Sequence, residues 1–168
     1  KKAPYKNVIS LGHLLDKEGK KMSKSRGNVV EPMDLFEKYS ADAVRWFFFT
    51  INQPGDSKLF DVSDLEKAKR NFIDLFLNTL NFYEMYKPVA KKTSRKNALD
   101  LWMEAKCALV SAEVTRRMDA YDVVGAARLI EDFVGNDISR WYVRRSRERM
   151  RSGEGVKVLR KTLLQTAI

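Results

Sequence analysis

The stretch DVVGAARLIEDFVGNDISRWYVRRSRERM, residues 122–150, decides the fold class of this chain. Its apolar residues recur at spacings of three and four, and they are Val123, Ala127, Ile130, Val134, Ile138 and Trp141. This spacing places them on one face of a long α-helix. The stretch therefore predicts a helix that buries one apolar stripe against other helices.

A second stripe of the same predicted helix is basic. About 100° around the helix from the apolar stripe, arginines recur at spacings of four and three: Arg140, Arg144, Arg147 and Arg151. Arg145 and Arg149 widen this stripe, and Glu148 is its one acidic neighbour between residues 138 and 153. Like charges four residues apart destabilise a helix by a few tenths of a kcal/mol per pair. An arginine stripe that persists against this cost indicates a phosphate backbone as its partner.

An alternative interpretation is that acidic side chains of neighbouring helices neutralise the arginines, with Glu104, Glu113 and Asp119 as candidates. The two aromatic residues of the stretch, Trp141 and Tyr142, are expected in the core rather than on the surface as stacking platforms for bases.

Further helices are predicted on both sides of this one. Ser63 and Glu66 have capping-box spacing, and their helix should end near Tyr86, before Pro88. A second helix is expected over residues 99–119, and a fourth after Gly153 and Gly155. Residues 59–168 are therefore expected to form an antiparallel helical bundle, truncated at its C-terminal end.

Residues 1–58 have a different pattern. Residues 7–15 are rich in apolar and β-branched side chains and predict a strand, and residues 20–28 predict an exposed loop. Short helices are expected over Pro32–Tyr39 and, capped by Ser40, up to Thr50. The expected fold class is mainly α: the C-terminal end of an α/β, Rossmann-like domain over 1–58, followed by the helical bundle over 59–168.

The net charge of +10 is unevenly distributed. Residues 1–28 contain 8 basic and 2 acidic side chains, and residues 140–161 contain 9 basic and 2 acidic ones. Two separated basic regions indicate two anionic partners or two parts of one long polyanion. The single cysteine, Cys107, excludes an internal disulfide and fits a cytoplasmic protein. No apolar run is long enough to cross a membrane, so no membrane partner is expected.

The first basic region contains Lys21-Met22-Ser23-Lys24-Ser25, followed by Arg26-Gly27-Asn28. Ammonium groups on long stems, small hydroxyls and a glycine suit a loop that holds a triphosphate. The motif G-x-x-x-x-G-K-[ST] is absent, which excludes an ordinary P-loop. From composition alone, a solvated basic hairpin without a ligand remains an alternative.

Residues 19–32 resemble the second signature of class I aminoacyl-tRNA synthetases, and residues 37–46 resemble a stretch of their Ile/Val/Leu/Met subgroup, with Ser40 where that subgroup usually has Gly. The resemblance implies that the loop closes over ATP, with Mg²⁺ expected alongside it, during amino-acid adenylation. It implies Lys24 and Lys21 as catalytic residues, and Ser23, Ser25 and Asn28 as further residues of the ATP loop. No metal site is expected in this chain.

Residues 119–122, 126–133 and especially 137–147 resemble the anticodon-binding helical domain of isoleucyl-tRNA synthetases. This implies an ATP-dependent ligase with isoleucine, ATP and tRNA(Ile) as partners, expected to be a cytoplasmic monomer. The implied tRNA contacts are Arg140, Arg144, Arg145, Arg147 and Arg151. The alternatives are a valyl-, leucyl- or methionyl-tRNA synthetase, or a non-catalytic tRNA-binding module.

The family's other ATP signature, His-x-Gly-His, needs two histidines, and this chain contains only His13. The 168-residue chain alone is therefore predicted not to activate an amino acid.

Overall fold

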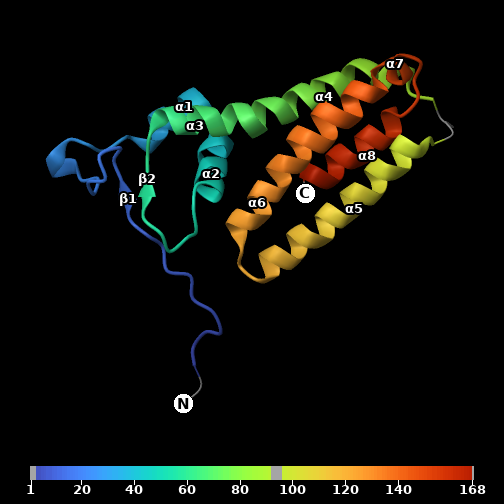
Figure 1. Ribbon diagram of the computed structural model, residues 1–168. Helices are drawn as coiled ribbons and strands as arrows, with labels where there is room; N and C mark the ends of the chain where they lie inside the picture. Colours follow the sequence, from blue (N-terminus) through green and yellow to red (C-terminus); the bar gives the residue numbers. More distant parts are fainter. Residues whose placement is uncertain (1–2, 92–95, 168) are drawn as a thin grey trace. The chain divides into compact units, whose positions relative to one another are not determined.

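The computed structural model describes residues 3–91 and 96–167, which form two compact units divided between Lys69 and Arg70 (Figure 1). The described residues are mainly helical with one small two-stranded sheet, which confirms the expected fold class. The domain boundary expected from the sequence is at 58/59, whereas packing divides the chain at 69/70. Among the described helices, none is long and apolar enough to cross a membrane.

The sheet of the first unit pairs strand β1, Leu14–Leu15, in parallel with β2, Lys58–Leu59. The strand predicted over residues 7–15 is therefore wrong in its extent, since residues 7–13 form no strand. Apolar and β-branched composition indicated an extended segment, but a strand also needs a neighbour, and the paired part of β2 is only two residues long.

Three helices complete the first unit: α1 Pro32–Tyr39, α2 Ala41–Thr50 and α3 Val62–Ala68. The Ser40 cap is confirmed, because its side chain accepts a hydrogen bond from the Ala43 amide at 3.3 Å. The predicted capping box is wrong, because Asp61 precedes Ser63 and accepts the Ser63 amide at 2.7 Å as the N-cap of α3.

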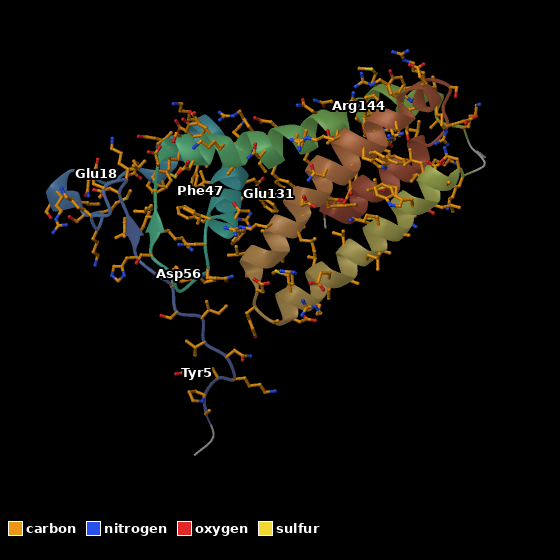
Figure 2. The ribbon with its side chains drawn as sticks, viewed as in Figure 1. Tyr5, Glu18, Phe47, Asp56, Glu131 and Arg144 are labelled. Carbon is orange, nitrogen blue, oxygen red and sulfur yellow. The ribbon has the colours of Figure 1, made fainter. Side chains whose placement is uncertain are left out.

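The core of the first unit lies between α2 and the residues around β2. Phe47 of α2, labelled in Figure 2, packs its ring against that of Phe60 at 5.7 Å between centroids. Tyr39 is buried and donates its hydroxyl to Glu66 of α3 at 2.8 Å. These contacts place α3 with α1 and α2 and explain why the first unit extends beyond residue 58.

The second unit is an antiparallel bundle (Figure 1). Its helices, and the π and 3₁₀ segments that continue or join them, are η2 Lys69–Asp74 (which begins at the last residue of the first unit), α4 Leu75–Tyr86, η3 Lys87–Val89, α5 Ala98–Asp119, α6 Val123–Asp132, η4 Phe133–Val143, α7 Arg144–Arg151 and α8 Val156–Ala167. α5 packs against α6, η4 and α8, and α4 packs against η4 and α8. The helix predicted over residues 99–119 is confirmed to within one residue as α5.

The helix predicted over residues 122–150 is present, but its central part, η4, is π-helical. A π-helix bonds each amide to the fifth preceding carbonyl, so its wider turn shifts the direction of the side chains that follow. Val134 and Ile138 are buried as predicted, but Trp141 is 43% exposed, and Tyr142 and Val143 take the buried positions. The prediction of a buried Trp141 was wrong, and that of a buried Tyr142 is confirmed.

Candidate functional site

The first candidate site is the loop of residues 16–28, called the lysine loop below, in the first unit. β1 leads into it, and Lys21 returns to Leu15 through an antiparallel bridge. Between these residues the chain turns at Gly19, whose amide donates to the Asp16 carbonyl at 2.9 Å. Glu18, labelled in Figure 2, belongs to this turn. Backbone contacts therefore hold the turn of residues 16–21 against the end of β1.

The buried carboxylate of Asp16 organises the loop. One oxygen accepts the amides of Glu18 at 3.1 Å and Lys20 at 2.8 Å. The other accepts the side-chain amide of Asn28 at 2.7 Å. These hydrogen bonds hold the pKa of Asp16 below its usual value, and the one from Asn28 has the largest effect. The carboxylate therefore remains ionised near neutral pH.

Asn28 also shapes the loop through its carbonyl oxygen, which accepts the Ser23 amide at 3.0 Å. Ser23 and Ser25 share a hydrogen bond between their hydroxyls at 3.3 Å. Lys24–Arg26 form one 3₁₀ turn, which ends at Gly27 with φ of 67°, a conformation that favours glycine. Ser23, Ser25 and Asn28 thus make contacts within the loop itself.

The cations of the loop face solvent. Lys21, Lys24 and Arg26 are exposed, and in the part of the chain that the structure describes none of them has a carboxylate within ion-pair distance. Unpaired ammonium groups next to small hydroxyls can bind phosphate oxygens without first breaking an ion pair. The geometry suits an anionic ligand with several charges.

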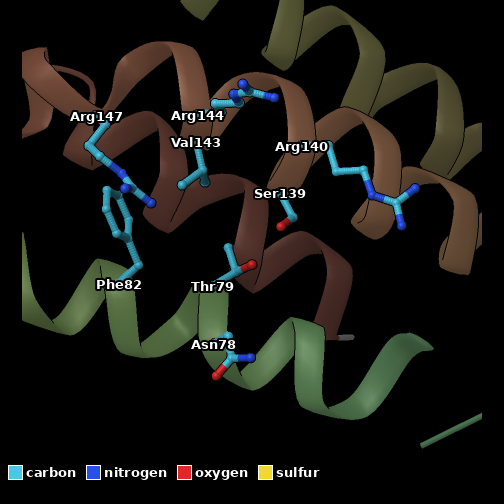
Figure 3. A pocket seen from close by; sticks show the side chains of 8 residues that line it. All are labelled: Asn78, Thr79, Phe82, Ser139, Arg140, Val143, Arg144 and Arg147. Carbon is cyan, nitrogen blue, oxygen red and sulfur yellow. The ribbon is translucent and has the colours of Figure 1, made fainter. Parts of the chain in front are cut away.

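The second candidate site is a groove of about 510 Å³ in the second unit, shown in Figure 3. Residues from α4 line one wall and residues from η4 and α7 the other: Asn78, Thr79, Phe82, Ser139, Arg140, Val143, Arg144 and Arg147. The structure thus brings three of the five predicted nucleic-acid contacts together. The α4 residues were missed from the sequence, because only packing shows which helix faces the arginines.

The predicted arginines differ in their surroundings. The Arg147 guanidinium lies 5.7 Å from the Phe82 ring, whereas Arg144 extends away from α4 (Figure 3). Arg140 donates to Asn136 at 2.8 Å. The Arg145 guanidinium lies 3.9 Å from the centre of the Trp141 ring, outside the groove lining.

Arg151 also lies outside that lining. It pairs with Glu148 at 3.0 Å, and a hydrogen bond with Tyr86, followed by the charge of Glu148, raises its pKa.

Arg149, by contrast, faces the interior of the bundle. It binds the buried carboxylate of Asp100 through both terminal nitrogens, at 2.7 and 3.3 Å. The Tyr142 hydroxyl donates to the same carboxylate at 2.8 Å, and Asp100 closes a capping box with Asn97 at the start of α5. Burial alone would raise the pKa of Asp100, but the hydrogen bonds from Arg149, Tyr142 and Asn97 outweigh it and lower the pKa.

Two of the acidic side chains considered as neutralising partners are engaged elsewhere. Glu104 pairs with Lys96 at 2.7 Å. Glu113 binds Arg116 and Arg117, which hold its pKa at about 2. Among the described residues, neither Arg144 nor Arg147 has an ion-pair partner, so the groove keeps uncompensated positive charge. A groove lined by guanidinium groups without acidic partners suits a nucleic-acid backbone.

No group of three or more His, Cys, Asp or Glu side chains that could hold a metal ion is found among the described residues, 3–91 and 96–167.

Comparison with known protein families matches both units. The family of class I tRNA synthetases for I, L, M and V matches residues 1–59, and the anticodon-binding domain of tRNA ligases matches residues 100–168. Together the two matches cover more than half of the chain.

Curated relatives agree with these matches. The isoleucine–tRNA ligase of Deinococcus radiodurans is 40% identical over 90% of this chain and 14% of its own length. That of Bacillus thuringiensis (strain Al Hakam) is 41% identical over 88% of this chain and 15% of its own length, and that of Clostridium tetani 40% over 90% and 15%. The chain therefore spans about one seventh of the length of these relatives.

A solved structure shares the fold. The crystal structure of LeuRS from Agrobacterium radiobacter K84, in a ternary complex with tRNA and LeuAMS, matches with a TM-score of 0.64 at 21% identity, over 94% of this chain and 20% of that one. The chain belongs to the class I aminoacyl-tRNA synthetases for I, L, M and V, and it matches a stretch of isoleucine–tRNA ligases that includes part of the anticodon-binding domain.

Proposed function

We propose that this chain acts as part of an ATP-dependent isoleucine–tRNA ligase. The observation that carries this proposal is the exposed pair Lys21 and Lys24, which have no ion-pair partner among the described residues, within a chain that is about 40% identical to isoleucine–tRNA ligases along 90% of its length. The reaction joins the isoleucine carboxylate to the α-phosphate of ATP and releases pyrophosphate. A hydroxyl of tRNA(Ile) then attacks the carbonyl of this adenylate, which forms the ester of isoleucine with tRNA and releases AMP.

In this proposal the lysine loop acts on the departing pyrophosphate. As the bond between the α- and β-phosphates breaks, negative charge grows on the leaving oxygens. The exposed ammonium groups of Lys24 and Lys21 would bind those oxygens and stabilise the charge. Ser23, Ser25 and Asn28 would keep the loop in a conformation that presents the two lysines. Mg²⁺ would enter with ATP, as its triphosphate complex.

The groove of the second unit would bind tRNA. Arg140, Arg144 and Arg147 present guanidinium groups, which can bind phosphate oxygens in a bidentate manner. Phe82 offers an aromatic face next to Arg147, which suits an unstacked base. Arg145 and Arg151, which lie outside the groove lining, would contribute further basic side chains. We propose that the protein works in the cytoplasm as a monomer.

The experiment that tests the proposal is ATP–pyrophosphate exchange by the full-length protein that contains this stretch, with isoleucine, valine, leucine and methionine supplied separately. We expect isoleucine to support the fastest exchange. Lys24→Ala should lower the exchange rate by about 100-fold or more, the usual effect of removing one group that stabilises transition-state charge. Lys157→Ala, an exposed lysine of α8 in the second unit, is the matched control and should leave the rate unchanged.

The possible outcomes separate the alternatives. A preference for valine, leucine or methionine would keep the enzyme class but change the substrate. Absence of exchange with all four amino acids would overturn the ligase proposal and favour a non-catalytic tRNA-binding protein. Equal rates for Lys24→Ala and the control would show that the loop does not act on ATP.

A further inference from the structure

We infer that Asp16 and Asn28 form a latch that holds the lysine loop in the conformation that binds phosphate, which makes both of them positioning residues. This inference rests on the proposed function, since it assigns the latch to the same ATP-binding loop. The observation behind it is a hydrogen bond of 2.7 Å that the Asn28 side-chain nitrogen donates to the Asp16 carboxylate. This bond joins the first and last residues of the loop, which are 12 positions apart in the sequence.

The latch connects three parts of the loop. Asp16 binds the turn at its start through the amides of Glu18 and Lys20. Asn28 binds Asp16 through its amide nitrogen and the Ser23 backbone through its carbonyl oxygen. A chain of hydrogen bonds thus runs from the turn, through both side chains, to Ser23, the residue that precedes the 3₁₀ turn carrying Lys24.

The loop needs such a latch because it has little else to hold it. Lys20, Lys21, Lys24 and Arg26 are exposed, and the 3₁₀ turn buries no residue. With Lys17, which pairs with Glu18 at 3.8 Å, the loop contains five cations, and these repel one another. Against these cations the loop has one anion that is buried among its described residues, the carboxylate of Asp16. Several hydrogen bonds lower the pKa of this carboxylate, and the one from Asn28 has the largest effect.

Asn28 is engaged on both sides of its amide: the nitrogen donates to Asp16 and the oxygen accepts from Ser23. The nitrogen also lies 3.4 Å from the Lys21 carbonyl. Asn28 therefore acts on a phosphate through the shape of the loop, while Lys21 and Lys24 present the charge.

The chemistry of the pair allows a sharp test by exchanging its members. In Asn28→Asp alone, two carboxylates face each other and repel. In Asp16→Asn alone, two amides face each other, and no flip of either leaves every donor with an acceptor. In the exchanged variant, Asp16→Asn with Asn28→Asp, residue 16 still accepts the two turn amides and donates to residue 28. Residue 28 still accepts Ser23, so the chain of hydrogen bonds from the turn to Ser23 is restored, and only the 3.4 Å contact with the Lys21 carbonyl is lost.

The experiment measures two properties of the full-length protein in the two single variants and the exchanged variant. Deuterium uptake by residues 16–28 reports the loop whether or not the protein activates an amino acid. ATP–pyrophosphate exchange, with kcat and KM for ATP measured separately, reports its use. Asn81→Asp, the same change at an exposed position of α4, is the control.

Each single variant should raise deuterium uptake of the loop and lower kcat/KM by about tenfold to 100-fold, the effect of losing one hydrogen bond to a charged group. The exchanged variant should recover most of both losses, and thermal unfolding should be unchanged throughout. Single variants with wild-type uptake, or an exchanged variant as poor as the singles, would overturn the latch. If the wild type shows no exchange but uptake follows this pattern, the proposed function fails and the latch stands as a device that holds the loop.

Discussion

The lysine loop and the α6–η4–α7 arginine helix both present cations to solvent, and each depends on one buried aspartate. Asp16, 9% exposed, binds partners within 12 residues of itself. Asp100, 1% exposed, binds Tyr142 and Arg149, which are 42 and 49 residues away. The first aspartate therefore sets the shape of one loop, while the second joins α5 to the helix that carries the arginines.

This difference separates two ways of presenting positive charge. A loop held by local hydrogen bonds can loosen and close again without disturbing the core, which suits a ligand that enters, reacts and leaves. A helix held by a long-range buried network keeps its arginines at fixed spacing, which suits a polyanion with regularly spaced phosphates. The comparison predicts that replacing Asp100 will lower the free energy of unfolding far more than replacing Asp16, whose effect should be limited to the lysine loop.

The largest expected effect comes from Asp100→Ala. This substitution removes the acceptor of two hydrogen-bond donors, the partly buried Arg149 guanidinium and the fully buried Tyr142 hydroxyl. Breaking a buried ion pair by removing one partner costs about 3–5 kcal/mol. We expect the free energy of unfolding of the second unit to fall by that amount, as measured by urea denaturation followed through far-UV circular dichroism.

Glu148→Ala is the control for this prediction, because the pair of Glu148 with Arg151 is exposed and should contribute less than about 1 kcal/mol. Asp16→Ala should leave the unfolding midpoint nearly unchanged. Equal losses of stability for Asp16→Ala and Asp100→Ala would contradict the distinction between the local and the long-range aspartate.

The second prediction concerns the exposed arginines. Arg144→Ala with Arg147→Ala should weaken tRNA binding, because two guanidinium groups without acidic partners are lost from the groove. The slope of log K against log salt should decrease by about one unit for each lost phosphate contact. The measurement is tRNA binding at several salt concentrations, with Arg160→Ala, an exposed arginine of α8, as the control. An unchanged slope accompanied by a loss of helix content would assign these arginines to stability instead.

Local signals in the sequence predicted much of the fold. Pro32 at the start of α1 and the Ser40 cap of α2 gave the bounds of those helices, because each signal acts within one turn. The bounds of α5 followed from periodicity in the same way. The same reasoning identified the lysine loop as an exposed segment.

Features that depend on distant packing were not predictable. The π-helical segment η4 shifts Trp141 to the surface, and no spacing in the sequence indicates that change of period. Arg149 has the same spacing in the sequence as the neighbouring arginines, yet it binds Asp100, which lies 49 residues earlier in the chain. The α4 wall of the groove, with Asn78 and Phe82, likewise appears only when the helices are packed.

The smallest effect is expected from substitutions at Ser40. They test whether interactions within one helical turn contribute to the stability of the first unit, as local hydrogen bonds shape the lysine loop. Ser40 has φ of 78° and ψ of 150°, a region populated almost only by glycine, where a side chain costs about 1–3 kcal/mol. Ser40→Gly relieves that strain and loses a cap that is worth only a few tenths of a kcal/mol against glycine. We therefore expect the first unit to gain about 1 kcal/mol, while Ser40→Ala, which keeps the strain and loses the cap, should lose about 1 kcal/mol. The measurement is urea unfolding followed by the fluorescence of Trp46. Trp102 and Trp141 are replaced by Phe in the wild type and in both Ser40 variants, so that Trp46 alone reports. A loss of stability in Ser40→Gly would show that the cap outweighs the strain.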